Sequence, residues 1–423
     1  MIDSEYYDRK KNLLDKTCFP QNMDVERRKF LKLATLLAAA TFGYVSFDTL
    51  SYVKRYLLHI FKEPTELHPP IYNPDTLIQQ NNRVVVVHDS RATSWDFTTG
   101  WYGDYVNQSV VDNMVNTGIM KLTGTPTIGD AWKALIPHYV SGDKIAIKVN
   151  FNNSMGYTDT HNNIDALMQP IDPIIAGLKE IGVSESDIWI YDALRPIPDR
   201  FINKCRYNDV SYYDIFGHEG RKKASFESTS PDTYINFVNS NIQRHQLTDV
   251  ITTATYIINI PIIKQHGGAG VTLSMKNHLG SLNPSTNTAI ENIPDLHAYL
   301  YLFSNSYSPR YNPLIDINSN PHINNKTILI IGDGLYGNWY SNWQKPRRWR
   351  TYNNSALNTL FFSRNAVAID SVMYDFLSAE TGIDQQSDDY LHIAAAKGLG
   401  VHEHRSRNNK YRLIDYVAID FDT

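Results

Sequence analysis

Short, unbroken apolar runs are the feature of this sequence that most constrains its fold. Arg83–His88 (RVVVVH), Lys144–Asn150 (KIAIKVN) and Asp187–Asp192 (DIWIYD) are the first three of them. Runs of this kind are typical of strands that helices cover on both faces of a sheet. Between the second and third runs, residues 165–181 carry apolar side chains at helical spacing, and Gly182 supplies a stop signal. Strand, helix and strand in this order predict a parallel sheet with right-handed crossovers.

The same alternation recurs towards the C-terminus. The further strand candidates are Tyr256–Ile260, Lys326–Gly332 and Leu360–Phe362, and the further helix candidate is Ala366–Leu377. Residues 200–244 and 283–325 are polar or loop-rich and poorly periodic, so we interpret them as insertions. We therefore predict an α/β fold over residues 83–423, with a mostly parallel central sheet, flanking helices and loop-rich insertions.

The composition suits such a fold and argues against other classes of protein. Of the 423 residues, 42% are hydrophobic and 20% are charged, which is ordinary for globular proteins and unlike disordered chains or proteins with many membrane spans. The formal net charge of -4 lacks the basic excess that favours binding to nucleic acid by counterion release. We expect no nucleic-acid partner.

Cysteine is scarce, which limits the cofactors that the chain can hold. The sequence contains only Cys18 and Cys205, whereas an iron–sulfur cluster takes about four cysteine ligands. We therefore expect no cysteine-ligated iron–sulfur cluster. A divalent metal held by histidine and carboxylate ligands stays open as a cofactor.

Residues 1–50 have features of an export signal. Arg27 and Arg28 stand just before Phe30 and Leu31, and residues 33–47 contain no charged side chain. This combination resembles a twin-arginine signal. The apolar run is shorter than the roughly 20 residues that a membrane-spanning helix needs. We expect the twin-arginine translocation machinery to be a partner, and the protein to reach the periplasm or the outer face of the cytoplasmic membrane.

The same N-terminal residues allow a second interpretation, an amphipathic helix that packs on the domain or lies on a membrane surface. Residues 50–61 are again apolar and basic, so we also consider a membrane tether through the N-terminus. Residues 51–82, which include the Pro-rich stretch ELHPPIYNPDT, are interpreted as a linker.

Chemically useful side chains are most concentrated in Pro261–Gly280 (PIIKQHGGAGVTLSMKNHLG). Glycines let backbone N–H groups converge on an anion, and the residues after them can start a helix whose N-terminus favours negative charge. We predict Lys264 and His266 as catalytic residues, because histidine transfers protons near neutral pH. The ligand-binding residues predicted here are Gly267, Gly268, Gly270, Thr272, Lys276 and Asn277. The alternative is a tight strand-to-helix connection with lysine and histidine on a solvated face.

Polar residues also follow several predicted strands, where open α/β sheets bind their ligands. Lys148, Asn150 and Asp333 are predicted to bind the same ligand from such positions. A metal version of the site uses His266, His278 and Asp192. Taken singly, aspartate and asparagine at strand ends are more often turn formers or helix caps. His402 and His404 alternate as metal ligands do, but their charged loop predicts a solvated segment.

Together these strings resemble the domain of unknown function 362 family. The likeness is carried by K-V-N, by D-I-W-I-Y-D, by the Pro261–Gly280 segment and by F-S-R-N-A-V-A-I-D-S-V. The resemblance implies export and, in part of the family, a metal cofactor or redox chemistry with ferredoxin-like cysteine clusters, which this chain lacks. It implies no settled reaction.

Two functions follow as hypotheses, and whether the protein is an enzyme stays open between them. The first is an exported enzyme that binds an anionic small molecule or a metal-containing cofactor at Lys264–Gly280. The second is a non-catalytic extracytoplasmic binding or assembly protein. Its tyrosines, 27 in the whole chain, would provide amphipathic contacts to a partner.

Overall fold

The computed structural model describes residues 82–284, 294–382, 385–406 and 410–422. The chain divides into two compact units, Met1–Pro70 and Ile71–Thr423, and every described residue lies in the second. The predicted signal and most of the predicted linker therefore lie outside the described residues. In the described part, no helix combines the length and the apolar character needed to cross a membrane.

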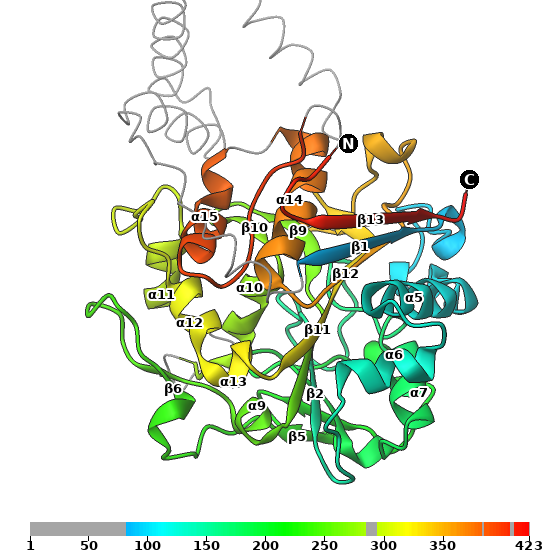
Figure 1. The fold of residues 1–423 in the computed structure, drawn as a ribbon, viewed down its shortest axis with the longest axis horizontal. Coiled ribbons are helices and arrows are strands. Elements are labelled where there is room, and N and C mark those ends of the chain that lie inside the picture. Colours follow the sequence, from blue (N-terminus) through cyan, green and yellow to red (C-terminus); the bar gives the residue numbers. More distant parts are fainter. Residues whose placement is uncertain (1–81, 285–293, 383–384, 407–409, 423) are drawn as a thin grey trace, which may run out of the picture. The chain divides into compact units, whose positions relative to one another are not determined.

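An eleven-stranded sheet forms the centre of the second unit (Figure 1). Nine of its strands follow one another across the sheet. In this order they are β13 (Asp415–Asp420), β1 (Arg83–His88), β12 (Thr359–Ser363), β11 (Thr327–Asn338), β8 (Tyr256–Asn259), β2 (Ile145–Lys148), β3 (Ile188–Tyr191), β4 (Ser211–Asp214) and β5 (Arg221–Lys223). The remaining two, β9 (Ile262–His266) and β10 (Gly270–Thr272), pair with each other, and β9 also pairs with β11.

Most neighbours in this sheet are parallel. The pairs β1·β13, β11·β8, β8·β2, β2·β3, β3·β4 and β4·β5 are all parallel. Only β12, which is antiparallel to both β1 and β11, interrupts the pattern on the main path. The predicted fold class, a mostly parallel α/β sheet with flanking helices, is confirmed.

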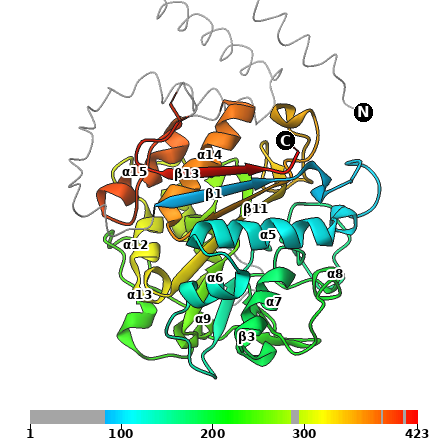
Figure 2. The same cartoon turned by 45° about the vertical axis from the view of Figure 1, so that its right-hand side comes forward.

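Helices cover both faces of the sheet, as Figures 1 and 2 show. On one face, Val85 and Val87 of β1 belong to a hydrophobic cluster that includes buried residues of α5 (Gln108–Thr123), α6 (Ile128–Leu135) and α7 (Asp172–Glu180). On the other face, Val84 and Val86 belong to a cluster that includes α14 (Ala366–Thr381) and α12 (Pro313–Ser319). The strand prediction for RVVVVH is confirmed, because successive side chains of a strand enter opposite cores.

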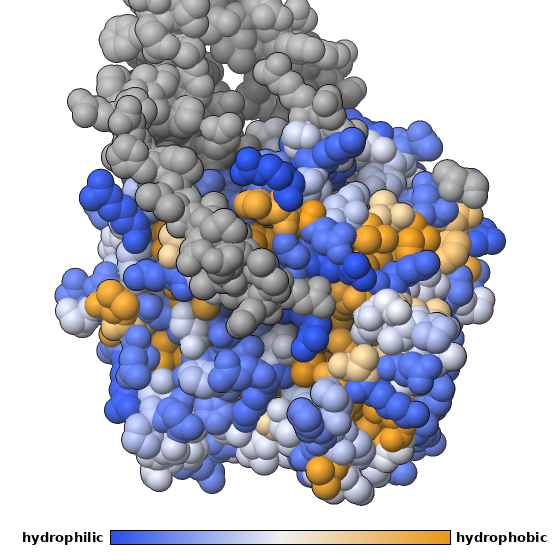
Figure 3. Space-filling model, in the orientation of Figure 1, coloured by the Kyte–Doolittle hydropathy of each residue, from blue (hydrophilic) through white to orange (hydrophobic). Residues whose placement is uncertain are grey.

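The shorter elements complete the unit. They are α8 (Asp199–Ile202), β6 (Tyr234–Ile235), β7 (His245–Gln246), α9 (Asp249–Thr253), α10 (Ser274–Asn277), α11 (Pro294–Leu300), α13 (Pro321–Asn324) and α15 (Asp389–Ala396). Hydrophilic residues cover most of the described surface on the face shown in Figure 3.

Element boundaries differ from the sequence-based expectation where proline or pairing decides them. The helix expected from residue 165 begins only at Asp172, with Pro173 in its first turn, where the missing N–H of proline costs no hydrogen bond. The strand expected over Lys326–Gly332 continues to Asn338, because its second half pairs with β9 and β12. Within residues 200–244, β4 and β5 extend the central sheet.

Candidate functional site

The Pro261–Gly280 segment is a hairpin followed by a single helical turn. Strands β9 and β10 are antiparallel, with His266 opposite Gly270 and Lys264 opposite Thr272. Lys264 and His266 therefore lie on a strand, whereas we expected them at a bend that leads directly into a helix. The difference arises because Gly270, with φ at +80°, lets the chain reverse and pair with itself.

The glycines of the hairpin serve close packing more than ligand binding. A Cβ atom on Gly270 would lie 2.3 Å from the Ser387 hydroxyl oxygen, and one on Gly268 would lie 2.6 Å from the ring of Tyr301. A Cβ atom on Gly267 would meet nothing within 4 Å. Two backbone amides of the turn, those of Gly268 and Ala269, donate to His266 Nδ1 at 3.1 and 3.0 Å.

These two bonds fix the tautomer of His266. Because Nδ1 accepts from two amides, the proton of the neutral ring is on Nε2. The ring is 7% exposed and faces His297 and Tyr301, with ring centroids 6.4 and 5.8 Å away. His266 is thus held in one orientation at the hairpin turn.

A carboxylate of the protein itself occupies the start of α10. Asp370 accepts hydrogen bonds from the amides of Ser274 at 2.7 Å and Met275 at 3.1 Å, and from the Tyr390 hydroxyl at 3.0 Å. Burial raises the pKa of Asp370 to about 6. We expected this helix N-terminus to bind a ligand anion, and that expectation is wrong because these donors already bind Asp370.

Lys148 and Asp192 form a buried ion pair at the ends of β2 and β3. Lys148 Nζ lies 3.1 Å from Asp192 Oδ2, which also accepts from the amide of Phe151 at 3.1 Å. Burial lowers the pKa of Lys148. A Cβ atom on Gly280 would lie 2.6 Å from Lys148 Nζ, so the end of the segment packs directly against the pair.

A chain of side-chain amides joins Lys264 to the segment that follows it. Lys264 Nζ donates to Asn150 Oδ1 at 2.8 Å, and Asn150 Nδ2 donates to Asn277 Oδ1 at 3.0 Å. Asn277 Nδ2 then donates to Asn259 Oδ1 at 2.8 Å. All four residues are buried. Burial lowers the pKa of Lys264 to about 8, while the nearby carboxylate of Asp165 opposes the change.

Lys276 lies at the accessible edge of this cluster. Its side chain is partly exposed, and no residue in the described part of the chain accepts a hydrogen bond from it. Burial, together with the charge of nearby Lys264, lowers the pKa of Lys276 to about 7. The hydroxyl oxygen of Thr272 is buried and likewise has no hydrogen-bond partner among the described residues. The site therefore offers polar groups that the protein does not satisfy.

An acidic residue, Asp165, interacts electrostatically with Lys264. Burial raises the pKa of Asp165 to about 7, and the charge of Lys264 opposes that change. Asp159 is close by, with its Oδ1 atom 2.9 Å from His161 Nε2. One buried oxygen of Asp159 and one of Asp165 have no hydrogen-bond partner in the described structure. Ligand atoms of Asp159, His161 and Asp165 lie within 4.8 Å of one another. Because His161 Nδ1 accepts from the amide of Asn163 at 3.2 Å and Nε2 lies 2.8 Å from the carbonyl oxygen of Asn153, a divalent metal would have to displace a backbone contact of this ring.

Asp333 is buried on β11, close to the start of the segment. Its amide donates to the carbonyl oxygen of Pro261 at 2.7 Å, and its carboxylate accepts from the amide of Leu335 at 3.0 Å. Burial raises the pKa of Asp333 to about 7. Within the described residues no hydrogen bond or ion pair joins Asp333 to Lys264 or Lys276, so the structure does not connect it directly to the lysines.

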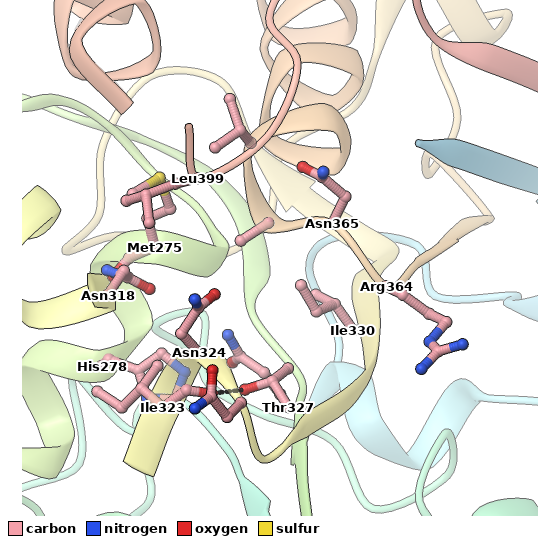
Figure 4. Close-up of a pocket in the computed structure, with 14 residues that line it drawn as sticks. Met275, His278, Asn318, Ile323, Asn324, Thr327, Ile330, Arg364, Asn365 and Leu399 are labelled. Carbon is pink, nitrogen blue, oxygen red and sulfur yellow. Dashed lines mark hydrogen bonds between the residues drawn. The ribbon is translucent and has the colours of Figure 1, made fainter. Parts of the chain in front are cut away.

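His278 lines a pocket of about 310 Å³ next to the segment. Burial lowers the pKa of His278 to about 3, so this ring is neutral at physiological pH. Asn259, the end of the amide chain, also lines the pocket. Figure 4 shows the Arg364 guanidinium group pointing away from the other labelled side chains. The pocket is thus lined by asparagine side chains, by the neutral imidazole of His278 and by apolar side chains such as those of Met275 and Leu399.

The histidine and carboxylate groups that could hold a metal are made of other residues than those predicted for it. In the described part of the chain, the sets with convergent ligand atoms are Asp388/His392/His402/His404, His88/Asp420/Asp422 and Asp159/His161/Asp165. None contains His266, His278 or Asp192. The prediction of a solvated loop is wrong for His402, which is 5% exposed.

The sequence did carry a signal for the largest of these sets. Asp388 and His392 are four residues apart, so they share one face of α15 and the turn before it. His402 and His404 are two residues apart in a segment without regular secondary structure. Neither pair indicates a metal by itself. Recognising the site requires knowing that the two pairs meet.

Comparison with known proteins places the chain in a family. Domain of unknown function (DUF362) matches residues 145–375, which is more than half of the 423 residues and contains every residue of the Lys264 cluster described above. No curated protein matches the chain. The chain therefore belongs to the DUF362 family of unknown function.

Proposed function

We propose that this protein is an exported enzyme that binds a small anionic molecule beside Lys264 and Lys276. The observation that carries the proposal is the Lys276 side chain, which is partly exposed, lacks a hydrogen-bond acceptor among the described residues and lies near a second, buried lysine. A carboxylate or phosphate group bound there would form charge-assisted hydrogen bonds with both ammonium groups. Its charge would offset the mutual repulsion of the lysines.

The two lysines suit different tasks. Lys264 is held in place by Asn150 at 2.8 Å and so provides a fixed positive charge. Lys276, with a pKa of about 7, exchanges its proton at neutral pH, as a general acid or base must. His266, oriented by two backbone amides, keeps its neutral proton on Nε2. We assign ligand binding to Lys264 and proton transfer to Lys276.

A metal-containing version of the same proposal uses the acidic side of the cluster. Asp159, His161 and Asp165 are the residues that would hold a divalent ion next to Lys264. Such an ion, when bound, polarises an oxygen atom of a substrate. The buried carboxylate oxygens without hydrogen-bond partners support this assignment, and elemental analysis of the purified protein tests it.

Ligand-induced stabilisation tests the anion site. We expect phosphate or a small carboxylate to raise the melting temperature of the wild type, because a ligand that binds only the folded state stabilises it. Lys276→Met and Lys264→Met should abolish that rise. Lys133→Met, which changes an exposed lysine, is the matched control and should keep it. Equal stabilisation of all four proteins by every anion of the panel would refute the proposal.

Catalysis is a separate question from binding. If the wild type binds an anion at these lysines but converts none of the bound compounds, the protein is instead a non-catalytic binding protein at the same site. Native mass spectrometry of protein folded in its own cytoplasm identifies a ligand that travels with it. The ligand found in this way is then the first compound to test for turnover.

Export by the twin-arginine route is also a proposal, and the pair Arg27 and Arg28 supports it. The double substitution of both arginines by lysine should leave the protein in the cytoplasm, whereas the wild type should appear in the periplasmic or membrane fraction. Lys32→Arg is a control substitution that leaves the paired arginines intact. Export of the double variant at the wild-type level would overturn the proposal.

A further inference from the structure

Four side chains from two separated parts of the C-terminal region converge on one point. Asp388 precedes α15, His392 lies within it, and His402 and His404 come from the following segment, which has no regular secondary structure. The ligand atoms of all four lie within 4.8 Å of one another. The rings of His392 and His402 are perpendicular with centroids 4.4 Å apart, and those of His402 and His404 are 4.9 Å apart at 85°.

Two of the three distances from the Asp388 carboxylate to the histidines match a tetrahedral metal site. Two ligands about 2.1 Å from a tetrahedral zinc ion lie about 3.4 Å from each other. Asp388 Oδ2 lies 3.4 Å from His392 Nε2 and 3.5 Å from His402 Nε2. Asp388 Oδ2 lies only 2.6 Å from His404 Nε2, which is a hydrogen-bond distance. A bound metal would replace this hydrogen bond, and the two atoms would then move apart. Three nitrogen ligands and one carboxylate oxygen are ordinary ligands for zinc.

Hydrogen bonding determines which ring nitrogen of His402 carries the proton and which carries the lone pair. The Ser371 hydroxyl donates to the carbonyl oxygen of Val367 at 2.7 Å. Its single proton is thereby used, so the 2.7 Å contact to His402 Nδ1 requires the ring nitrogen to donate. His402 Nε2 then carries a lone pair. This atom is buried and has no hydrogen-bond partner in the described structure, although it faces the Asp388 carboxylate.

The outer side of the cluster is also arranged as in metal sites. His404 Nδ1 lies 2.8 Å from Asp375 Oδ1, which gives the carboxylate–histidine pair that orients many metal-bound imidazoles. Asp375 in turn accepts from the amide of Arg405 and the hydroxyl of Tyr411, each at 2.7 Å. Ser371 and Asp375 both belong to α14. The helix α14 therefore orients His402 and His404 through hydrogen bonds to their Nδ1 atoms.

We propose that Asp388, His392, His402 and His404 bind one divalent transition-metal ion, with zinc as the best fit, in a site that links α15 to residues 401–406. The protein supplies all four positions of a tetrahedron, which is the pattern of structural rather than catalytic zinc sites. All four ligands lie beyond residue 375, where the family match ends. The proposal does not depend on the anion site at Lys264.

The test is zinc binding by the full chain after removal of metal with a chelator. We expect about one equivalent of Zn²⁺ to bind in isothermal titration calorimetry and to raise the melting temperature. His402→Ala and Asp388→Asn should each weaken binding by about 100-fold or more, and Ser371→Ala by about 10- to 100-fold through its effect on His402. His138→Ala, which removes an exposed histidine, should bind like the wild type.

Further measurements distinguish the outcomes. The Co²⁺-substituted wild type should show the intense visible absorption of a tetrahedral ion, and His402→Ala should lose it. His161→Ala separates this site from the Asp159/His161/Asp165 set, and it should keep the zinc affinity. Circular dichroism of each variant without metal shows whether it is folded. The proposal is overturned if the wild type binds no zinc, or if the folded His402→Ala and Asp388→Asn proteins bind it as tightly as the wild type does.

Discussion

Replacing Lys276 by methionine should make the protein more stable while removing the proposed ligand site. The lysine is charged in the unfolded chain, where its ordinary pKa is 10.5, but its pKa falls to about 7 in the folded protein. A group with a lowered basic pKa opposes folding, because the folded state binds its proton less tightly. Methionine has a similar shape, stays neutral and carries no such penalty.

The magnitude follows from the two pKa values. A fall from 10.5 to about 7 corresponds to an upper limit of about 5 kcal/mol, at about 1.4 kcal/mol for each pH unit. Because water reaches part of the side chain and screens its charge, we expect a gain of about 1–3 kcal/mol in the free energy of unfolding at pH 7. The sequence change that most weakens the proposed anion binding is thus expected to stabilise the fold.

The pH dependence of the stability difference between Lys276→Met and the wild type is a sharper test than its size at pH 7. Between pH 7 and the unfolded pKa of 10.5, the unfolded state holds the Lys276 proton and the folded state does not, so stability rises with pH in this window. The gain from Lys276→Met should therefore shrink by about 1–2 kcal/mol between pH 7 and pH 9. Urea unfolding at both pH values measures it, with exposed Lys133→Met as the control.

Two results would refute the reasoning. The first is a loss of more than about 1 kcal/mol in Lys276→Met at pH 7, since ordinary surface changes stay within about 0.5 kcal/mol. That loss would mean that Lys276 makes a stabilising contact. The second is a difference from the wild type that stays constant between pH 7 and pH 9, which would mean that the lysine titrates normally.

Three further substitutions test the packing and the buried ion pair around the site. In thermal unfolding, Gly270→Ala should lower the free energy of unfolding by about 1–3 kcal/mol, because φ is +80° and the new Cβ atom would lie 2.3 Å from Ser387 Oγ. The control Gly267→Ala should change the free energy of unfolding by less than about 1 kcal/mol. Equal effects of the two substitutions would contradict the packing argument. Asp192→Asn should cost about 3–5 kcal/mol in urea unfolding by leaving Lys148 charged and unpaired in the interior, and an unchanged midpoint would show that Lys148 is neutral in the folded protein.

The parts of the fold that depend on local pattern could be predicted from the sequence. Arg83–His88 forms β1 with the predicted bounds and with its four valines buried, because a short β-branched run is typical of a strand covered on both faces. Ala366 begins α14 as predicted. The pairing of β1 with β13 could not be predicted in this way, because Asp415–Asp420 (DYVAID) has aspartate at both ends and lacks a β-branched run. It becomes a strand through its long-range partner.

In the candidate site, too, features that depend on local sequence could be predicted, and those that depend on long-range contacts could not. Position at strand ends was sufficient to predict that Lys148, Asn150 and Asp192 lie near the Pro261–Gly280 segment, since parallel strands end at the same side of a sheet. The sequence does not show whether an amide of the glycine-rich turn faces a ligand or a side chain, and the amide of Gly268 donates to His266 Nδ1. The alternation of His402 and His404 is visible in the sequence, but its meeting with Asp388 and His392 could not be predicted, because residues 393–401 separate the two pairs.

The order of strands has a consequence for synthesis. β1 is translated first among the described strands, yet its two neighbours are β12 and β13, which are translated near the end. A nascent chain that still lacks Asp415–Asp420 presents the backbone donors and acceptors of β1 to other chains, and such an unpaired edge promotes aggregation. Contacts between strands that are so far apart in the sequence form slowly. The ribosome must therefore release nearly the whole chain before this sheet is complete, and chaperones that shield β1 until then would raise the yield of native protein.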